Sequence, residues 1–384
     1  MGSFSNIPIV RLDTDIEECV YVSLCLQVGS LFDQSYSGIA HFLEHALIEM
    51  AGLSYDINYF RLSGRTTFTS TIYYLELTNK KQLPQAINLM KEIYDGNNLN
   101  RIDIEKIRCD ITQEYYRKSS NINFSNIRKL LGSAMLAKSP IGNIIDINNI
   151  SINDLLNHHC TYYNALQNPI IMIVGYNDTI DLTPNFVLKK VNDLNSFRKI
   201  EKPFLENSNV TYYSQYINCN CVDYFFKITS IDRISMSVAF TIIEIYMKKF
   251  YAINYSIVVD VNITIANHTV DIQYATVRII NCDKCKPLSI VNKSEFTTYL
   301  FQQLSDEVLN IYLNEFKNTM LNDYIGNRQI FENAIRSYMY GEPLYIRSEF
   351  NKNISEITVC QVRESLVDLL KGRKLIYKNA PRRI

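Results

Sequence analysis

The sequence predicts an α+β protein of two similar halves, each a mainly antiparallel sheet covered by helices. Segments with the two-residue alternation of strands and segments with helical periodicity follow one another along all 384 residues. A chain of this length exceeds one ordinary hydrophobic core, so two domains are expected. The second half also repeats the order of elements of the first half, which favours a duplicated architecture even without obvious sequence identity between the halves.

The first half begins with a strand over residues 18–28, where apolar residues alternate with Tyr, Ser, Cys and Gln as in a half-buried strand. Gly38 opens a helix that should end near Gly52. Residues 66–77, rich in Thr, Phe, Tyr and Ile, predict a second strand, and residues 82–94 have the apolar spacing of a helix. A strand therefore leads into the first helix.

Two further helices, starting at Asp103 and Ser151, and an apolar strand at 170–174 complete the first half. Mixed charge, proline and many asparagines then mark a connection between domains. The expected organisation is an N-terminal domain of residues 1–190, a linker of residues 191–215 and a C-terminal domain of residues 216–384.

The second half shows the same succession of strand and helix signals. Its expected strands are 221–229, 256–265 and 269–280, the last two joined at Asn267-His268, and its expected helices are 234–251, 296–322, 328–340 and 360–370.

Residues 38–45 contain two of the 5 histidines of the chain, four positions apart, with Glu44 directly before the second. Positions i and i+4 share one face of a helix, so His41 and His45 can reach one ion. The order H-x-x-E-H is the inverzincin pattern, the reverse of H-E-x-x-H. Catalytic zinc takes three protein ligands and a water, and Glu44 is placed to take a proton from that water. The alternative is a buried helix whose two histidines are hydrogen-bonded.

A third ligand is expected on the helix that starts at Asp103. There Glu114 continues an apolar stripe with Ile104, Ile107 and Ile111, so its carboxylate points inward. Glu105 faces away and is the weaker candidate. The alternative for Glu114 is an end-of-helix carboxylate that reaches solvent. The metal site expected from these residues is one Zn²⁺ per chain.

Composition excludes some classes of function. Lys+Arg and Asp+Glu both number 39, so no net field attracts nucleic acid. No stretch of 18 uncharged apolar residues predicts a membrane span, and no secretory signal is visible. The 9 scattered cysteines suit a reducing cytoplasm. A structural zinc site at Cys282 and Cys285 with Cys219 and Cys221 is disfavoured, since the last pair has an unusual spacing.

Several segments resemble the pitrilysin/insulysin group of zinc peptidases, especially short two-domain members such as subunits of the mitochondrial processing peptidase and bacterial relatives. Residues 28–30 followed by 38–45 resemble the family signature, and residues 111–114 resemble its third-ligand segment. Similarity to the end of the family's first domain continues in Pro140-Ile141-Gly142, Tyr162-Tyr163, Asn168 and residues 171–175. The similarity covers most of residues 18–175 and fades afterwards.

The resemblance implies a clam-like chamber of two halves, with zinc held by His41, His45 and Glu114 and with Glu44 as general base. It also implies that an extended peptide substrate adds as a strand to an exposed sheet edge. The residues expected to bind substrate at this edge are Thr66, Thr67, Phe68, Thr69 and Ser70.

Family members also carry an Arg and a Tyr, seven positions apart in the second half, that hold the substrate near zinc. Residues 247–256 resemble that segment, with Tyr255 kept and Lys248 where Arg is expected. Tyr255 is expected to hydrogen-bond the substrate carbonyl oxygen, whereas Lys248 lacks the bidentate geometry of a guanidinium. Ile107 stands where the family usually has a second, supporting glutamate, which predicts weaker metal binding.

Short members of the family often divide these parts between two chains, and this chain resembles the zinc-bearing one. The resemblance therefore implies a homodimer, or a heterodimer with a related subunit that carries the Arg/Tyr pair. The expected function is that of a zinc endopeptidase in a bacterial cytoplasm, maturing a ribosomally made peptide such as a bacteriocin precursor by analogy with small relatives. The alternatives are a non-catalytic subunit that serves assembly or peptide capture and general turnover of short peptides.

Overall fold

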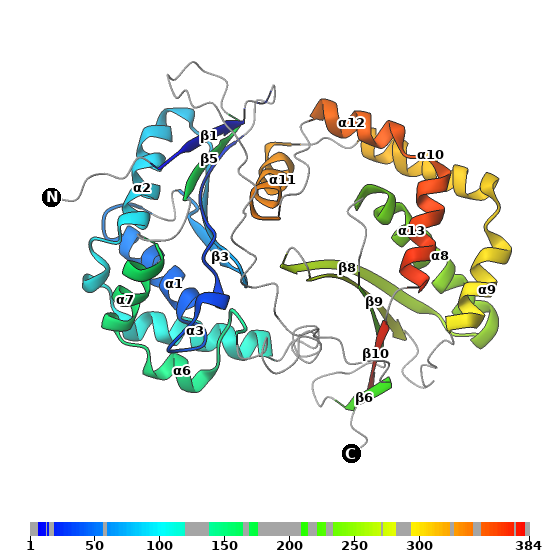
Figure 1. The fold of residues 1–384 in the computed structure, drawn as a ribbon, viewed down its shortest axis with the longest axis horizontal. Coiled ribbons are helices and arrows are strands. Elements are labelled where there is room, and N and C mark those ends of the chain that lie inside the picture. The colour runs from blue at the N-terminus through cyan, green and yellow to red at the C-terminus, as the bar shows by residue number, and fades with distance from the viewer. Residues whose placement is uncertain are drawn as a thin grey trace. The chain divides into compact units, whose positions relative to one another are not determined.

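The chain forms two compact units, each built on its own five-stranded sheet (Figure 1). The computed structural model describes residues 7–12, 14, 19–56, 60–119, 138–163, 169–175, 209–213, 221–227, 233–269, 272–281, 293–322, 326–340, 347–371 and 374–380. Among these, unit 1 comprises the residues up to 175 together with 326–340, and unit 2 comprises the others.

Unit 1 carries its strands in the order β1-β5-β2-β4-β3, with β1 parallel to β5 and every other pair antiparallel. The strands are β1 (Ile9–Leu12), β2 (Val20–Leu26), β3 (Ser63–Thr66), β4 (Thr71–Leu77) and β5 (Ile170–Val174). The helices are α1 (Ile39–Gly52), α2 (Leu83–Asp95), α3 (Ile104–Ser119), α6 (Ile144–Asn149), α7 (Ile152–Tyr162) and α11 (Asn327–Tyr340).

Unit 2 repeats this topology in the order β6-β10-β7-β9-β8, again with one parallel pair, between the first and last strands. Its strands are β6 (Asn209–Tyr213), β7 (Cys221–Lys227), β8 (Val259–Thr269), β9 (Ile272–Asn281) and β10 (Lys374–Ala380). Its helices are α8 (Arg233–Tyr255), α9 (Lys293–Gln303), α10 (Asp306–Asn322), α12 (Arg347–Glu356) and α13 (Val359–Lys371). The predicted α+β class with two similar, mainly antiparallel sheets is confirmed.

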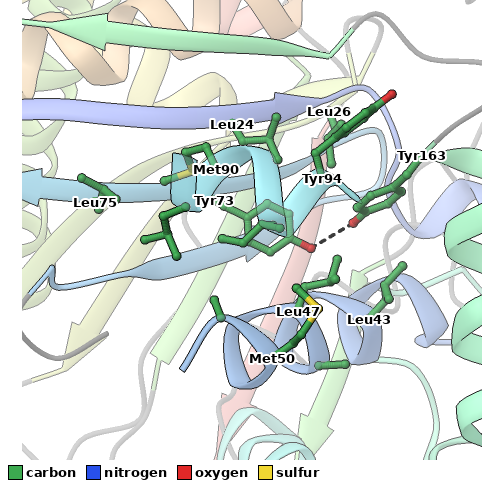
Figure 2. Close-up of a cluster of buried hydrophobic side chains, with 14 of the residues drawn as sticks. Leu24, Leu26, Leu43, Leu47, Met50, Tyr73, Leu75, Met90, Tyr94 and Tyr163 are labelled. Atoms are coloured by element: carbon green, nitrogen blue, oxygen red, sulfur yellow. Dashed lines mark hydrogen bonds between the residues drawn. The ribbon is translucent and has the colours of Figure 1, made fainter. Parts of the chain in front are cut away.

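The core of unit 1 lies between its sheet and helices α1 and α2. Figure 2 shows leucine and methionine side chains filling this space around Tyr73 and Tyr163, whose hydroxyl groups are 2.9 Å apart. Each fully buried Leu or Met contributes roughly 1.5–3 kcal/mol to folding. The two tyrosines are fully buried, and their mutual hydrogen bond satisfies hydroxyls that would otherwise be costly in an apolar core.

Helix α11 covers the opposite face of the unit 1 sheet from α1 and α2 (Figure 1, orange). The ring of Phe331 stacks on Tyr21 of β2, with centroids 5.1 Å apart. Asn327 at the helix start accepts a hydrogen bond from Thr14 at 2.6 Å and donates one to the Cys19 carbonyl. The prediction of a half-buried strand is therefore wrong for β2, because α11 buries its second face as well.

The predicted domain boundaries did not include α11 in the N-terminal part, and most of the predicted linker lies outside the described residues. The predicted boundaries therefore stay a prediction. Helix α11 belongs to unit 1 although it lies in the last quarter of the sequence.

Several predicted elements differ in detail. The predicted strand 66–77 is interrupted: Thr66 ends β3, residues 67–70 form a hairpin turn closed by the Thr67 N–H, which donates to the Ser70 carbonyl, and β4 begins at Thr71. Residues 296–322 form two helices, because Ser305 caps the start of α10 by accepting from the Val308 N–H. Asn267 and His268 lie within β8 at a register irregularity, not in a turn.

The remaining predicted helices and strands of both halves are present, with ends that shift by a few residues. Strands β1, β6 and β10 and helices α6 and α12 have no counterpart among the sequence predictions. No described helix is both long enough and apolar enough to span a bilayer.

Candidate metal centre and active site

The start of α1 is held by the buried carboxylate of Asp33, which lies in the segment before the first helical residue, Ile39. Both oxygens of Asp33 accept backbone hydrogen bonds, one from Gly38 at 2.7 Å and one from Ala40 at 3.1 Å. Burial raises the pKa of Asp33 to about 7, although these two hydrogen bonds and the charge of Lys138 act in the opposite direction. The N–H groups at a helix start have no partner within the helix, so Asp33 satisfies donors that α1 leaves free.

A second support for α1 is a contact between two glycine backbones. Gly38 and Gly142 both have positive φ, 95° and 69°. A Cβ on Gly142 would lie 2.4 Å from the Ser37 carbonyl oxygen and 2.8 Å from the Gly38 Cα. Only glycine fits this backbone geometry at both positions.

Replacing Gly142 by alanine is expected to destabilise the protein and lower its metal content, because the new methyl group pushes on the residues that lead into His41. Left-handed backbone and backbone overlap together predict a fall in melting temperature on the order of 5–10 °C. Thermal unfolding measures it. Gly52→Ala, at the exposed end of the same helix, should leave the melting temperature unchanged or slightly raised, and equal melting temperatures for both variants would contradict the prediction.

Two histidines of α1 and one glutamate of α3 meet at a single point. The Nε2 atoms of His41 and His45 lie 3.5 Å and 3.4 Å from Glu114 Oε2. The side chains of His41, His45 and Glu114 are 7%, 28% and 16% exposed, respectively. Within the part of the chain that the structure describes, these residues form the one group of three His, Cys, Asp or Glu side chains close enough to share an ion.

The donor atoms fit zinc. Zinc–nitrogen and zinc–oxygen bonds of about 2.0–2.2 Å in a tetrahedron place neighbouring donors roughly 3.3–3.5 Å apart, which matches the two distances to Glu114 Oε2. Two imidazoles and one carboxylate are also the donor set of several catalytic zinc sites. The other oxygen, Glu114 Oε1, pairs with Lys118 Nζ, so one carboxylate oxygen remains for an ion.

Charges in the cluster favour a cation. Hydrogen bonds with His41 and then His45 hold the pKa of Glu114 well below its usual range. Burial alone would lower the pKa of His45, but the hydrogen bond with Glu114 and the charges of Glu44, Glu114 and Asp110 raise it overall. The site therefore attracts positive charge, which a proton or a metal ion can supply.

The outer shell of the cluster is incomplete on one side. His41 Nδ1 is buried and has no hydrogen-bond partner among the described residues, whereas metal-bound histidines usually donate their second N–H to a carboxylate or carbonyl. Ile107, where the family usually has a supporting glutamate, is buried in the core. Both observations agree with the expectation of weaker metal binding.

Glu44 lies in the turn of α1 that joins the two histidines and is only 4% exposed. Thr66 of β3 donates its hydroxyl to Glu44 Oε2 at 2.6 Å. A Cβ on Gly64 would lie 2.4 Å from Glu44 Oε1. The sequence did not predict that Gly64 or Thr66 contacts Glu44. For Gly64 a signal was present, because a glycine within a strand often marks a place where another group lies close to the backbone.

The predicted substrate-binding residues fall into two groups. Thr66 lies on β3, the last strand of the sheet order and therefore an edge strand. Residues 67–70 form the turn that follows, and the carbonyls of Thr67 and Phe68 accept hydrogen bonds from Ser30 and Leu31. Phe68 and Ser70 are buried. Of the five residues, Thr66 alone belongs to the edge strand, and the binding role of the group stays a prediction.

Lys248 and Tyr255 belong to α8 of unit 2. Lys248 Nζ lies 2.7 Å from Glu244 Oε1 and 3.7 Å from Asp260 Oδ1. Tyr255 packs its ring against Phe250 and Tyr251. Their roles toward a substrate stay predictions.

Glu105, the weaker candidate for the third ligand, and the remaining histidines of unit 1 do not belong to the cluster of His41, His45 and Glu114 described above. Glu105 is 74% exposed and pairs with Arg108. His158 and His159 are buried, and burial lowers the pKa of both, to about 4 for His158. His159 Nε2 lies 2.9 Å from the Tyr94 carbonyl oxygen. Both histidines are thus packing residues. Cys282, Cys285 and Cys219 lie outside the described residues.

Comparison with known proteins matches residues 9–146 to the family model described as insulinase, peptidase family M16. The human mitochondrial-processing peptidase subunit beta is 25% identical over 196 residues, which cover 46% of this chain and 39% of that protein. The putative zinc protease AlbF of Bacillus subtilis is 27% identical over 172 residues, or 42% of this chain and 40% of that protein. The match thus spans about two fifths of the length of these relatives.

Likeness of fold extends further than likeness of sequence. The crystal structure of a protease from Helicobacter pylori superposes with a TM-score of 0.65 at 14% identity and covers 98% of both chains. At this identity the likeness shows the fold alone. The H-x-x-E-H helix, the converging Glu114 and the match over residues 9–146 together make this part of the chain similar to the insulinase (M16) family of peptidases.

Proposed function

We propose that this protein is a zinc-dependent endopeptidase that cleaves extended peptides. The observation that carries the proposal is the convergence of His41, His45 and Glu114 within 4.8 Å, with Glu44 on the helical turn between the histidines. A site of this kind combines a metal with an adjacent base, which is what hydrolysis of an unactivated amide needs.

His41 Nε2, His45 Nε2 and Glu114 Oε2 would hold the ion, while Lys118 keeps the other oxygen of Glu114 engaged. When bound, zinc supplies a Lewis acid for the scissile carbonyl and lowers the pKa of a water molecule to about 7. Glu44 accepts the proton of the attacking water and later passes it to the leaving amine, so it acts first as base and then as acid.

The edge of β3 offers a place for the substrate. An edge strand presents unpaired backbone N–H and C=O groups, and an extended peptide can add to them as a further strand. Strand β3 ends at Thr66, whose hydroxyl touches Glu44. A peptide bound along β3 would therefore pass beside the proposed base.

The substrate proposed is a ribosomally made peptide precursor, such as that of a bacteriocin, in a bacterial cytoplasm. The proposal of this substrate rests on analogy with small relatives of the family. Deletion of the gene should leave at least one precursor peptide uncut in the cell, as measured by mass spectrometry of the peptide fraction. Broad cleavage of unrelated unstructured peptides would favour general turnover instead.

The first experiment is metal removal. The purified chain is expected to contain about one zinc, the count that a single three-ligand site predicts, and to cleave an unstructured test peptide. A chelator should remove both zinc and activity, and stoichiometric zinc should restore both. Absence of zinc after refolding with excess metal would overturn the proposal and favour a non-catalytic protein.

A second candidate is a subunit that binds zinc but needs a partner chain for cleavage. It is favoured by Lys248, which stands where the family has Arg and is engaged by Glu244 and Asp260. The match to a protein named as one subunit of a peptidase also supports it. A purified chain that holds a full complement of zinc but cleaves no peptide, and that gains activity after mixing with a related Arg/Tyr-bearing chain, would establish this alternative as a heterodimer.

A further inference from the structure

Glu44 is a buried carboxylate with few partners. Its residue is 4% exposed, and Thr66 is its side-chain hydrogen-bond partner among the described residues. A buried polar group needs a hydrogen-bond partner, so the Thr66 hydroxyl is the contact that orients this carboxylate.

The single proton of the Thr66 hydroxyl is directed to Glu44. The other hydroxyl nearby, on Thr71, is 3.4 Å away, compared with 2.6 Å to Glu44 Oε2. Thr71 donates its own proton to the Val28 carbonyl at 2.8 Å. Thr71 therefore leaves Thr66 free to donate to the carboxylate.

Gly64 leaves room for the second carboxylate oxygen of Glu44, Oε1, because it has no side chain. Gly64 and Thr66 are two positions apart on β3, so both face the same side of the strand. A Cβ at Gly64 would be 2.4 Å from Oε1 and 2.7 Å from the carboxylate carbon of Glu44. The carboxylate thus lies against the backbone of β3, with one oxygen held by Thr66 and the other over Gly64.

We propose that Thr66 and Gly64 are positioning residues for Glu44, and that β3 sets both the place of the base and the place of the peptide. This inference rests on the proposed function, since it assigns Glu44 as base. A peptide that adds to β3 is then aligned with Glu44 through one rigid strand, and loss of the Thr66 hydroxyl should impair turnover more than binding.

The test compares Thr66→Val, Thr66→Ser and Thr78→Val. Valine keeps the shape of threonine but lacks the donor, and kcat should fall about 10- to 100-fold, the range expected for one hydrogen bond to a charged group. KM and zinc content should stay within about twofold. Serine should restore kcat to within about threefold. Thr78, exposed just after β4, is the matched control and should behave as wild type.

Gly64→Ala should likewise lower kcat with zinc retained, because its methyl group displaces the carboxylate. A wild-type kcat for Thr66→Val, or a kcat for Thr66→Ser as low as that for valine, would overturn the inference. If zinc-loaded wild type cleaves nothing, the proposed function fails, and thermal unfolding still tests the contact. Thr66→Val should then lower the melting temperature when it is made in the wild-type protein, but not when it is made in the Glu44→Ala protein. An equal fall in both backgrounds would show that the Thr66 hydroxyl does not stabilise the protein through Glu44.

Discussion

Replacing Glu44 by glutamine is expected to abolish peptide cleavage while zinc stays bound. Glutamine has the shape of glutamate and keeps an oxygen that can accept from Thr66, so the three metal ligands should not move. It cannot take a proton from water, and loss of a general base costs about 10²- to 10⁴-fold in rate. Cleavage of a test peptide and zinc content of the same sample measure the two effects.

The matched control for this variant is Glu49→Gln on the same helix. Glu49 pairs with Lys106 at 2.7 Å on the partly exposed side of α1, and an exposed pair contributes little to stability. Its rate should stay within about twofold of wild type. Retention of more than about a tenth of the wild-type rate by Glu44→Gln would show that another group serves as base.

Replacing Glu114 by glutamine is expected to release the metal and, with it, all activity. The change exchanges a charged oxygen, 3.4–3.5 Å from both imidazole Nε2 atoms, for a neutral amide that competes poorly for zinc. Loss of an outer-shell partner alone costs about 10- to 100-fold in metal affinity, so loss of a direct ligand should cost at least about 100-fold. Competition against a chromogenic chelator measures the affinity.

Glu105→Gln is the control for this second variant, because Glu105 lies on the same helix but is 74% exposed. It should bind zinc as wild type does. Stoichiometric, tightly held zinc in Glu114→Gln would mean that Glu114 is not the third ligand, and Asp110, whose charge acts on His45, would be the next residue to replace.

The histidine pair and Glu114 could be predicted because their geometry is mostly local. Four-residue spacing fixes His41 and His45 on one helix face, and the apolar stripe of α3 indicates which carboxylate points inward. The edge strand was also anticipated near Thr66, but the turn at 67–70 was not, since it contains neither glycine nor proline and closes through backbone contacts with Ser30 and Leu31.

The sequence by itself determined the α+β class, the repeated order of elements and the two-histidine helix, because each depends on residue spacing within one segment. The tertiary structure alone decided which residues support the base and which cover the sheet. Thr66 meets Glu44 across 22 positions, and Asn327 meets Thr14 across 313. Such contacts depend on how distant segments pack, and no local periodicity encodes them.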